Sequence, residues 1–171
     1  MIYRYLAIDL GAESGRVMLG TLQEGRISLE ELSRFSNTPI REGDAMYWNI
    51  PSLLDGIRAG LTKAGALGQV ITSVSADAWG VDYVLLDAKG EVMEPVFHYR
   101  HPRTAEGEKR VLARVDWPTL FGESGVQYIL LNTSIQLSSE EPQRLTKAKT
   151  ILTIADAFNY LLSGVGRIEV S

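Results

Sequence analysis

The sequence predicts an α/β domain in which a mixed β-sheet starts with a three-strand meander and is flanked by helices. The prediction depends on two observations: closely spaced strand patterns at the N-terminus, and alternating helix and strand patterns after them. Strands joined by tight turns pair antiparallel, whereas a strand reached through a helix pairs parallel. A chain that contains both kinds of connection therefore builds a mixed sheet covered by helices.

The meander is predicted from Tyr3–Ile8, a buried strand, followed by strands at Arg16–Leu22 and Arg26–Arg34. Glu24 and Gly25 form the turn before the strand at Arg26–Arg34. In that strand, apolar and polar residues alternate with the period of a strand. The next segment, Asn37–Asp44, is polar and contains a proline and a glycine, so we predict a loop there.

The rest of the chain alternates between helices and strands. Pro51–Ala64 predicts a helix, because proline suits a first turn and the apolar residues fall on one face. Further predictions are strands at Val70–Ser75, Tyr83–Leu86 and Thr150–Thr153, a turn at Asp87–Gly90, mainly helix beyond Arg103, and a helix from Asp156 to Ser163 capped by Gly164.

Length and composition restrict the class of protein. The 171 residues suffice for one domain with a sizeable core and are too few for two comfortable ones. A net charge of −4 argues against nucleic-acid or anionic-membrane partners, which require a basic face. The absence of cysteine excludes disulfides and thiolate chemistry. The first apolar stretch stops at Asp9, too early for a signal peptide, so we expect a cytoplasmic protein.

A glycine-containing turn at residues 9–16, Asp-Leu-Gly-Ala-Glu-Ser-Gly-Arg, joins the first two predicted strands. Its glycines are expected to adopt backbone angles closed to other residues, so that successive N–H groups point into one concavity suited to phosphate. Ser14 and Arg16 add a hydroxyl and a guanidinium, and Asp9 is placed to hold Mg²⁺ through water. The alternative is an ordinary hairpin with a surface acid, and the carboxylate of Glu13 opposes phosphate binding.

A second candidate site lies in Ser75–Tyr83, which joins two predicted strands. Asp77 and Asp82 can accept hydrogen bonds from sugar hydroxyls, and Trp79 offers a flat apolar face to sugar C–H groups. Ligands of open α/β sheets gather at the carboxyl ends of strands, which favours this position. The alternative is a strand connection with solvated acids and a packed tryptophan.

The chain has two histidines, His98 and His101, within the polar and basic segment Val96–Thr104. Any imidazole chemistry must therefore occur there. A metal site on this pair lacks an obvious third ligand. Contacts to substrate hydroxyls or phosphate, or a solvated loop, are the preferred interpretations.

In order along the chain, several motifs resemble the N-terminal domain of the FGGY family of carbohydrate kinases, within the actin-like ATPase superfamily. The resemblance covers essentially the whole chain and implies a ribonuclease H-like fold. The motifs are Ala7–Leu19, like the phosphate-binding opening; Asp77–Asp87, like the sugar-contacting segment; Ser124–Leu137, like a stretch typical of members that act on L-rhamnulose; and Asp156–Gly164, like the Asp-x-Phe-x-Tyr-x-Leu-Ser/Thr-Gly helix.

The resemblance implies that the intact enzyme transfers the γ-phosphoryl group of Mg²⁺·ATP to the C1 hydroxyl of L-rhamnulose, with another ketose or a polyol as the alternative. The implied phosphate contacts are Ala12, Glu13, Ser14, Gly15 and Arg16, the implied sugar contacts are Trp79, Gly80 and Asp82, and the implied magnesium residue is Asp9. Two residues depart from the family pattern: His101 stands where relatives usually carry an acid, and Glu13 where many carry serine or threonine.

The resemblance also implies that the general-base aspartate and most of the adenine pocket lie beyond Ser171, near a second kinase domain. Residues 1–171 are thus predicted to be a truncated N-terminal kinase domain, with the missing domain as its natural intramolecular partner. Asp77 and Asp82 are the only substitutes for the base, and we assign the role to neither. We therefore expect no kinase activity from this chain alone. A non-catalytic module that binds sugar or nucleotide remains as an alternative.

Overall fold

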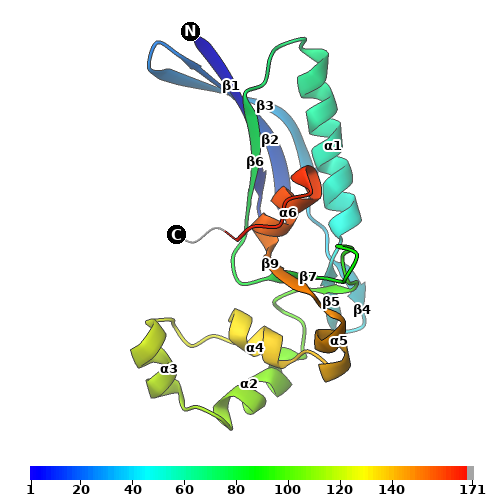
Figure 1. Ribbon diagram of the computed structural model, residues 1–171, viewed down its shortest axis with the longest axis vertical. Coiled ribbons are helices and arrows are strands. Elements are labelled where there is room, and N and C mark those ends of the chain that lie inside the picture. The colour runs from blue at the N-terminus through cyan, green and yellow to red at the C-terminus, as the bar shows by residue number, and fades with distance from the viewer. Residues whose placement is uncertain (169–171) are drawn as a thin grey trace. The chain divides into compact units, whose positions relative to one another are not determined.

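The computed structural model describes residues 1–168, and its contacts divide the chain into two compact units. Unit 1 contains residues 1–38, residues 49–80 and the described residues after 153. Unit 2 contains residues 39–48 and 81–153. Figure 1 labels the helices and strands, and the two units are described separately below.

Unit 1 is built on a four-stranded sheet with the strand order β3-β2-β1-β6. The first pairs are antiparallel, whereas β6 pairs parallel with β1, so the predicted mixed sheet and its opening meander are confirmed. Glu24 and Gly25 both have positive φ, 52° and 75°, as a two-residue hairpin turn requires. The strands are β1 (Ile2–Leu10), β2 (Ser14–Gln23), β3 (Arg26–Ser36) and β6 (Ser73–Ala78).

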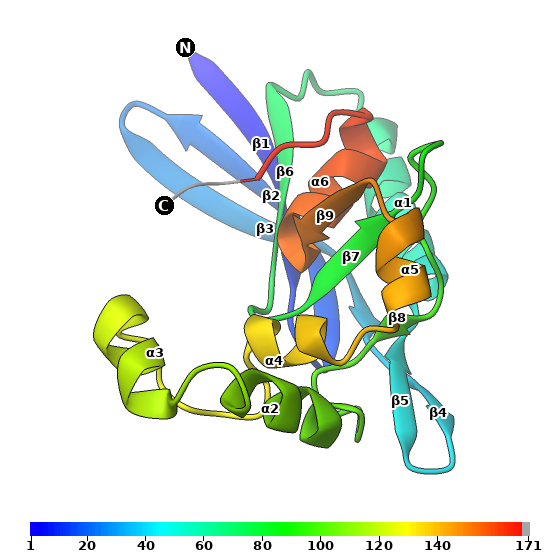
Figure 2. The same ribbon diagram turned by 60° about the horizontal axis from the view of Figure 1, so that its bottom comes forward.

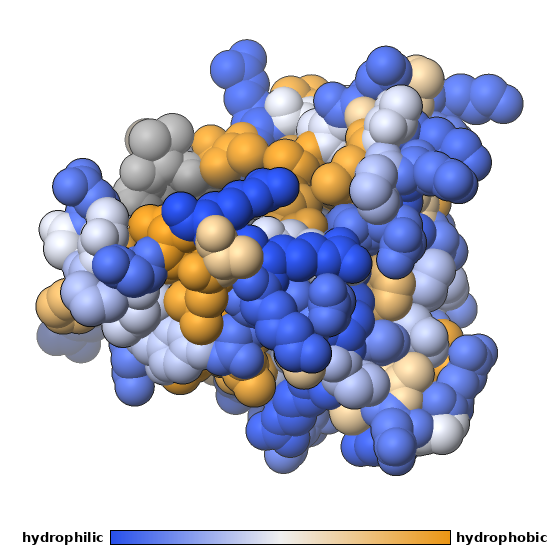
Figure 3. Space-filling model, turned by 90° about the horizontal axis from the view of Figure 1, so that it is seen from below, coloured by the Kyte–Doolittle hydropathy of each residue, from blue (hydrophilic) through white to orange (hydrophobic). Residues whose placement is uncertain are grey.

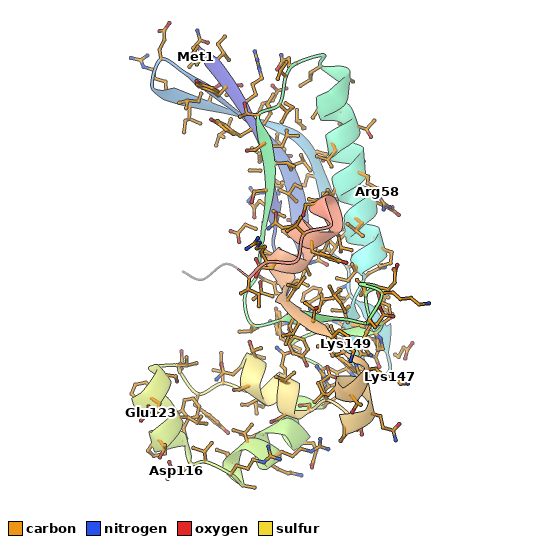
Figure 4. All side chains as sticks on the ribbon, in the orientation of Figure 1. Met1, Arg58, Asp116, Glu123, Lys147 and Lys149 are labelled. Carbon is orange, nitrogen blue, oxygen red and sulfur yellow. The ribbon has the colours of Figure 1, made fainter. Side chains whose placement is uncertain are left out.

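Two helices pack on this sheet. Helix α1 (Ile50–Ala66) contacts β2 and β3, and α6 (Ile154–Ser163) contacts β6 (Figures 1 and 2). The Asn49 side chain caps α1 by accepting from the Ser52 N–H at 3.1 Å. Arg58, on the solvent side of α1, points away from the sheet (Figure 4). The largest fully buried apolar side chains of unit 1 are Ile8, Leu10, Val17, Leu53, Ile57, Ile154 and Phe158.

Unit 2 combines two small antiparallel sheets with short helices. One sheet has the order β4-β5-β8, and the other pairs β7 with β9. Helix α2 packs on α4, and the side that carries these helices is covered largely by hydrophilic residues with apolar patches between them (Figure 3). The elements are β4 (Ile40–Glu42), β5 (Ala45–Trp48), β7 (Tyr83–Leu86), β8 (Val96–Phe97), α2 (Thr104–Leu112), α3 (Trp117–Ser124), α4 (Thr133–Ser138), α5 (Pro142–Lys147) and β9 (Thr150–Thr153).

The predicted loop at Asn37–Asp44 is wrong, because β4 lies within it and forms a hairpin with β5. Gly43, at φ 59°, supplies the turn. Strand β4 has only three residues, all of them exposed, so it carries no alternating pattern that a sequence reading could detect. Pairing with β5 creates the strand, and that contact is visible only in three dimensions.

Two further boundaries differ from prediction. The strand predicted at Val70–Ser75 begins at Ser73 and runs to Ala78, because its parallel pairing with Tyr5–Leu10 sets the register. Helix α6 begins at Ile154, so Asp156 lies in its first turn. Gly164, at φ 74°, confirms the predicted C-terminal cap, and the strands at Tyr83–Leu86 and Thr150–Thr153 have the predicted bounds. Among residues 1–168, no helix is long and apolar enough to cross a membrane.

Candidate functional site

The turn between β1 and β2 is closed by hydrogen bonds to its own carbonyl groups. The Gly11 N–H donates to the Ser14 carbonyl at 2.8 Å, and the Asn37 N–H donates to the Glu13 carbonyl at 2.9 Å. The Asn37 side-chain Nδ2 donates to the Gly11 carbonyl, also at 2.9 Å. Within residues 1–168, no acceptor takes the N–H groups of Ala12 and Glu13. The turn thus points carbonyls into the protein and leaves two amides available to an anion.

The prediction that the two glycines of the turn adopt special backbone angles is wrong, and Gly15 is needed for space instead. Neither Gly11 nor Gly15 has a positive φ. A Cβ atom on Gly15 would lie 2.3 Å from Cε2 of Phe35, and the same ring lies as close to Gly56 of α1. Phe35 therefore packs over Gly15 and Gly56 and holds the start of β2 against its neighbours.

Asp9 and Arg16, the predicted magnesium residue and phosphate-binding arginine, face one another in the β1–β2 register and form an ion pair. Their side chains are 48% and 40% exposed, so the pair contributes about 0–1 kcal/mol and its members can exchange partners at low cost. Asp77 is the register partner of Asp9 on β6. The structure thus brings two carboxylates to one end of adjacent strands, next to the turn.

The predicted sugar-contacting residues fall in both units. Trp79 and Gly80 end a segment of unit 1, where the tryptophan is half-buried and the glycine exposed. Asp82 belongs to unit 2 and is 2% exposed, and its Oδ2 accepts a hydrogen bond from Nε1 of Trp48 at 2.6 Å. Its carboxylate is therefore held by a buried indole, in contrast to the solvated acid considered as the alternative.

The backbone next to Asp82 takes an unusual conformation. Val81 has φ 68°, which is a strained value for a β-branched residue. Its carbonyl accepts from Oγ1 of Thr133 at 2.8 Å and from Nε2 of Gln136 at 3.2 Å. Gln136 is 1% exposed and also donates to the Leu131 carbonyl at 2.9 Å. The Ser124–Leu137 motif and the Asp77–Asp87 motif, which are far apart in sequence, are thus joined at one carbonyl.

His98 stacks on Trp48 with ring centroids 4.0 Å apart. Burial, with the nearby charges of Arg100 and Arg41, lowers the pKa of His98 to about 4. Its Nδ1 accepts from the Arg100 N–H at 3.0 Å, which fixes the proton of the neutral ring on Nε2. His98 is consequently a neutral, oriented donor beside the tryptophan that holds Asp82.

His101 is one of the two residues at which the sequence is expected to depart from the pattern of the family it resembles. Its Nδ1 accepts from the Arg103 N–H at 3.0 Å, and its ring meets Phe97 edge-on. Burial and the charge of Arg103 lower its pKa. No group of three or more histidine, aspartate or glutamate side chains able to hold a metal occurs in the part of the chain that the structure describes.

A buried ion cluster accounts for much of the basic segment that the sequence suggested as a substrate contact. The carboxylate of Glu140, 1% exposed, pairs with Arg103 at 2.8 Å and with Arg144 at 3.2 Å. The Tyr83 hydroxyl donates to the same carboxylate at 2.7 Å, and burial raises the pKa of Tyr83. Arg103 also lies 3.6 Å above the ring of Phe97. Arg103 is thus a packing residue of unit 2.

Sequence reasoning missed the structural roles of Asn37, Trp48, Gln136 and Glu140, although all four are buried and hold parts of the site or its surroundings. Their partners lie 26 to 55 residues away for the first three. A local pattern does not report such contacts. The one available signal was at Gln136, a polar residue between the apolar residues Ile135 and Leu137.

The chain is similar in sequence to curated rhamnulokinases. It is 38% identical over 169 residues to the rhamnulokinase of Mannheimia succiniciproducens and 36% identical over 167 residues to that of Bacillus subtilis. These matches cover 96% and 98% of this chain but 35% and 34% of the relatives. The chain therefore spans about a third of the length of the relatives it matches, and this is their N-terminal third. No family model matches the chain.

Solved structures of sugar kinases have the same fold. Xylulose kinase from Rhodospirillum rubrum matches with a TM-score of 0.79 and 19% identity, covering 97% of this chain and 36% of that one. A carbohydrate kinase from Novosphingobium aromaticivorans matches with a TM-score of 0.77 and 20% identity, covering 96% and 35%. The chain therefore has the fold of these sugar kinases, and the expected likeness to carbohydrate kinases holds in both sequence and structure.

Proposed function

We propose that this chain, which is related to the N-terminal third of rhamnulokinases, is part of a sugar kinase that transfers the γ-phosphoryl group of ATP to the C1 hydroxyl of L-rhamnulose. The supporting observation is sequence similarity along nearly the whole chain, at 38% identity to one rhamnulokinase and 35% to another. Phosphoryl transfer depends on positioning and charge neutralisation. We therefore expect the site to contain backbone amides, an arginine and a divalent cation.

In this proposal, the turn at residues 9–16 binds the phosphates of ATP. The free amides of Ala12 and Glu13, with Ser14 and Gly15 after them, bind phosphate oxygens, while the exposed carboxylate of Glu13 stays in solvent. Arg16 exchanges its partner carboxylate for phosphate. A phosphate oxygen is the stronger competitor because it offers more charge to a forked donor.

The two carboxylates at the end of β1 and β6 suit a hydrated divalent cation. Asp9 and Asp77 are register partners on neighbouring strands, and Mg²⁺ usually keeps several waters and binds one or two carboxylates besides phosphate. When bound, the cation neutralises charge on the transferring phosphoryl group. We propose that Asp9 holds Mg²⁺ through water once Arg16 has turned to the phosphates.

The sugar side falls to Trp79, Gly80 and Asp82. Support comes from the strained backbone of Val81, which lies between Gly80 and Asp82 and has φ 68°. Strained backbone persists only where the surrounding structure enforces it, and such positions cluster at ligand contacts. Thr133 belongs to the motif typical of L-rhamnulose kinases, and it fixes this carbonyl. The preference for L-rhamnulose over another ketose is proposed on that basis.

The proposal extends to the parts of the enzyme outside this chain. The resemblance assigns the general-base aspartate to sequence after Ser171, and Asp82 is already engaged by Trp48. We therefore propose that residues 1–171 are an N-terminal kinase domain whose partner is a second kinase domain, that the protein works in the cytoplasm where ATP is available, and that this chain alone is inactive.

A chimera tests the activity. This chain replaces the matching N-terminal third of the Bacillus subtilis rhamnulokinase, and ADP release is measured with L-rhamnulose, D-xylulose and glycerol. We expect phosphorylation of L-rhamnulose, abolished by Asp9→Ala in the same chimera. A folded chimera that prefers D-xylulose or glycerol refutes the sugar assignment, and sugar phosphate formed by the isolated chain refutes its inactivity.

A further inference from the structure

Asn37 follows the last residue of β3 and is 4% exposed, which is unusual for an asparagine. It makes two contacts with one short segment of the same unit. Its backbone N–H donates to the Glu13 carbonyl and its Nδ2 donates to the Gly11 carbonyl, both at 2.9 Å. A single residue therefore holds the peptide group between Gly11 and Ala12 and the one between Glu13 and Ser14.

These contacts decide which way the peptide groups of the turn face. In each peptide group the N–H and the C=O point in opposite directions, so a carbonyl tied into the protein leaves its amide facing outward. The Gly11 carbonyl shares a peptide group with the Ala12 N–H, and that N–H has no acceptor within residues 1–168. Without the Asn37 side chain, this peptide can rotate and present an oxygen where an anion needs a donor.

Stability does not explain why asparagine occupies this position. Its Oδ1 is buried and has no hydrogen-bond partner in the described part of the chain. Burial of an unpaired polar atom is unfavourable and offsets the hydrogen bond that Nδ2 makes. The net contribution of the side chain to folding is therefore small, whereas its effect on the direction of the Gly11 carbonyl is specific.

We propose that Asn37 is the positioning residue of the phosphate turn. It never touches the ligand, and it acts by holding the Gly11 carbonyl inward through its Nδ2 so that the amide of Ala12 faces phosphate, while its backbone N–H fixes the Glu13 carbonyl at the end of the turn. This inference deepens the proposed function and depends on the turn being the phosphate site. Nothing in the sequence of the turn itself reveals it, because the residue lies 26 positions from Gly11.

Two variants and one matched control separate positioning from folding. Asn37→Ala removes the Nδ2 donor and keeps the backbone N–H. Asn37→Asp introduces a group that donates to the Gly11 carbonyl only when it is protonated, so its effect depends on pH. The control is Asn159→Asp, because Asn159 also donates its Nδ2 to a backbone carbonyl at 2.9 Å, that of Ala76, within the same unit.

The experiment follows the backbone amides of ¹⁵N-labelled chain 1–171 by NMR, first alone and then during titration with inorganic tripolyphosphate. We expect Asn37→Ala to mobilise Ala12 and Glu13 and to weaken tripolyphosphate binding about tenfold, which equals about 1.4 kcal/mol. Asn37→Asp should do the same at neutral pH and approach the parent as the pH falls, each compared with the parent at the same pH. Asn159→Asp should bind like the parent.

The possible results distinguish this inference from the proposed function. If tripolyphosphate shifts the turn amides equally in the parent and in Asn37→Ala, positioning by Asn37 is refuted while the phosphate site stands. If the parent turn is ordered and Asn37→Ala disorders it, yet neither binds tripolyphosphate, Asn37 orders the turn but the phosphate site is refuted, and with it the role of Asn37 in phosphate binding. Should Asn37→Ala fail to fold, an Asn37→Asp chain without the pH-dependent recovery overturns the inference.

Discussion

Replacing Glu140 with glutamine should destabilise unit 2 by about 3 kcal/mol. The Glu140 carboxylate is 1% exposed and forms ion pairs with Arg103 at 2.8 Å and with Arg144 at 3.2 Å. Glutamine has nearly the same shape, and its amide oxygen can still accept from the Tyr83 hydroxyl. The substitution therefore removes one charge and little else, leaving two guanidinium groups without their carboxylate.

The size of the expected loss in unfolding free energy depends on the contacts that Arg103 and Arg144 retain in the Glu140→Gln chain. Removing one partner of a buried ion pair costs about 3–5 kcal/mol. Arg103 retains its position above Phe97, and Arg144 still donates to the carbonyls of residues 93–95. These contacts and their 12% and 18% exposure place the loss at the lower end, about 3 kcal/mol. For a urea slope of about 2 kcal/mol/M, the unfolding midpoint falls by about 1.5 M.

The assay is urea unfolding followed by tryptophan fluorescence, in which the buried Trp48 reports on unit 2. Glu141→Gln is the matched control, because the neighbouring glutamate is exposed and makes no side-chain capping bond in α5. We expect the control to stay within about 0.5 kcal/mol of the parent. A Glu140→Gln chain as stable as the control would show that the cluster does not hold unit 2 together.

Two further predictions concern packing and pH. Gly15→Ala should lower the free energy of unfolding of unit 1 in urea by about 1–3 kcal/mol, because Phe35 must move from its place over the turn. Adding Phe35→Leu should recover part of this loss, and an unchanged urea midpoint of unfolding for Gly15→Ala contradicts the packing explanation. His98 should titrate at about pH 4 when its ring proton is followed by NMR. Because the pKa of His98 in the folded chain lies below the usual 6.5, the unfolded chain binds the proton more readily, and the free energy of unfolding falls as the pH drops from 6.5 toward 4. His98→Gln should make this fall less steep, whereas titration of the His98 ring near pH 6.5 contradicts the burial argument.

Local patterns in the sequence predict much of the fold. The meander and α1 are found because alternation, turn residues and helical spacing are properties of neighbouring residues. The β4–β5 hairpin at Ile40–Trp48 is missed because its strands are short and exist only through pairing. The start of β6 at Ser73 is misplaced because its register depends on β1, which lies more than sixty residues earlier.

The candidate site divides in the same way. The residues of the phosphate turn are found from their own spacing, but the reason given for its glycines is wrong, because Phe35 approaches Gly15 from another strand. Arg103 looks like a ligand contact in the sequence, since nothing near it reveals Glu140 as its partner. Each error has the same physical cause, namely a side chain whose environment is made by residues distant in sequence.

The two candidate subsites share a structural device that bears on how an isolated chain should bind. In unit 1 the buried Asn37 amide holds the Gly11 carbonyl, and in unit 2 the buried Gln136 amide holds the Val81 carbonyl. Each of these two carbonyls is therefore held by contacts within one unit, so ligand binding need not supply the free energy of ordering it. In the proposed intact kinase, the second domain would then contribute contact area. If an intact site of about −7 kcal/mol loses half its contacts, the remaining −3.5 kcal/mol corresponds to a Kd of roughly 3 mM. Weak binding without disorder-to-order changes in the turn amides is the expected behaviour of this chain.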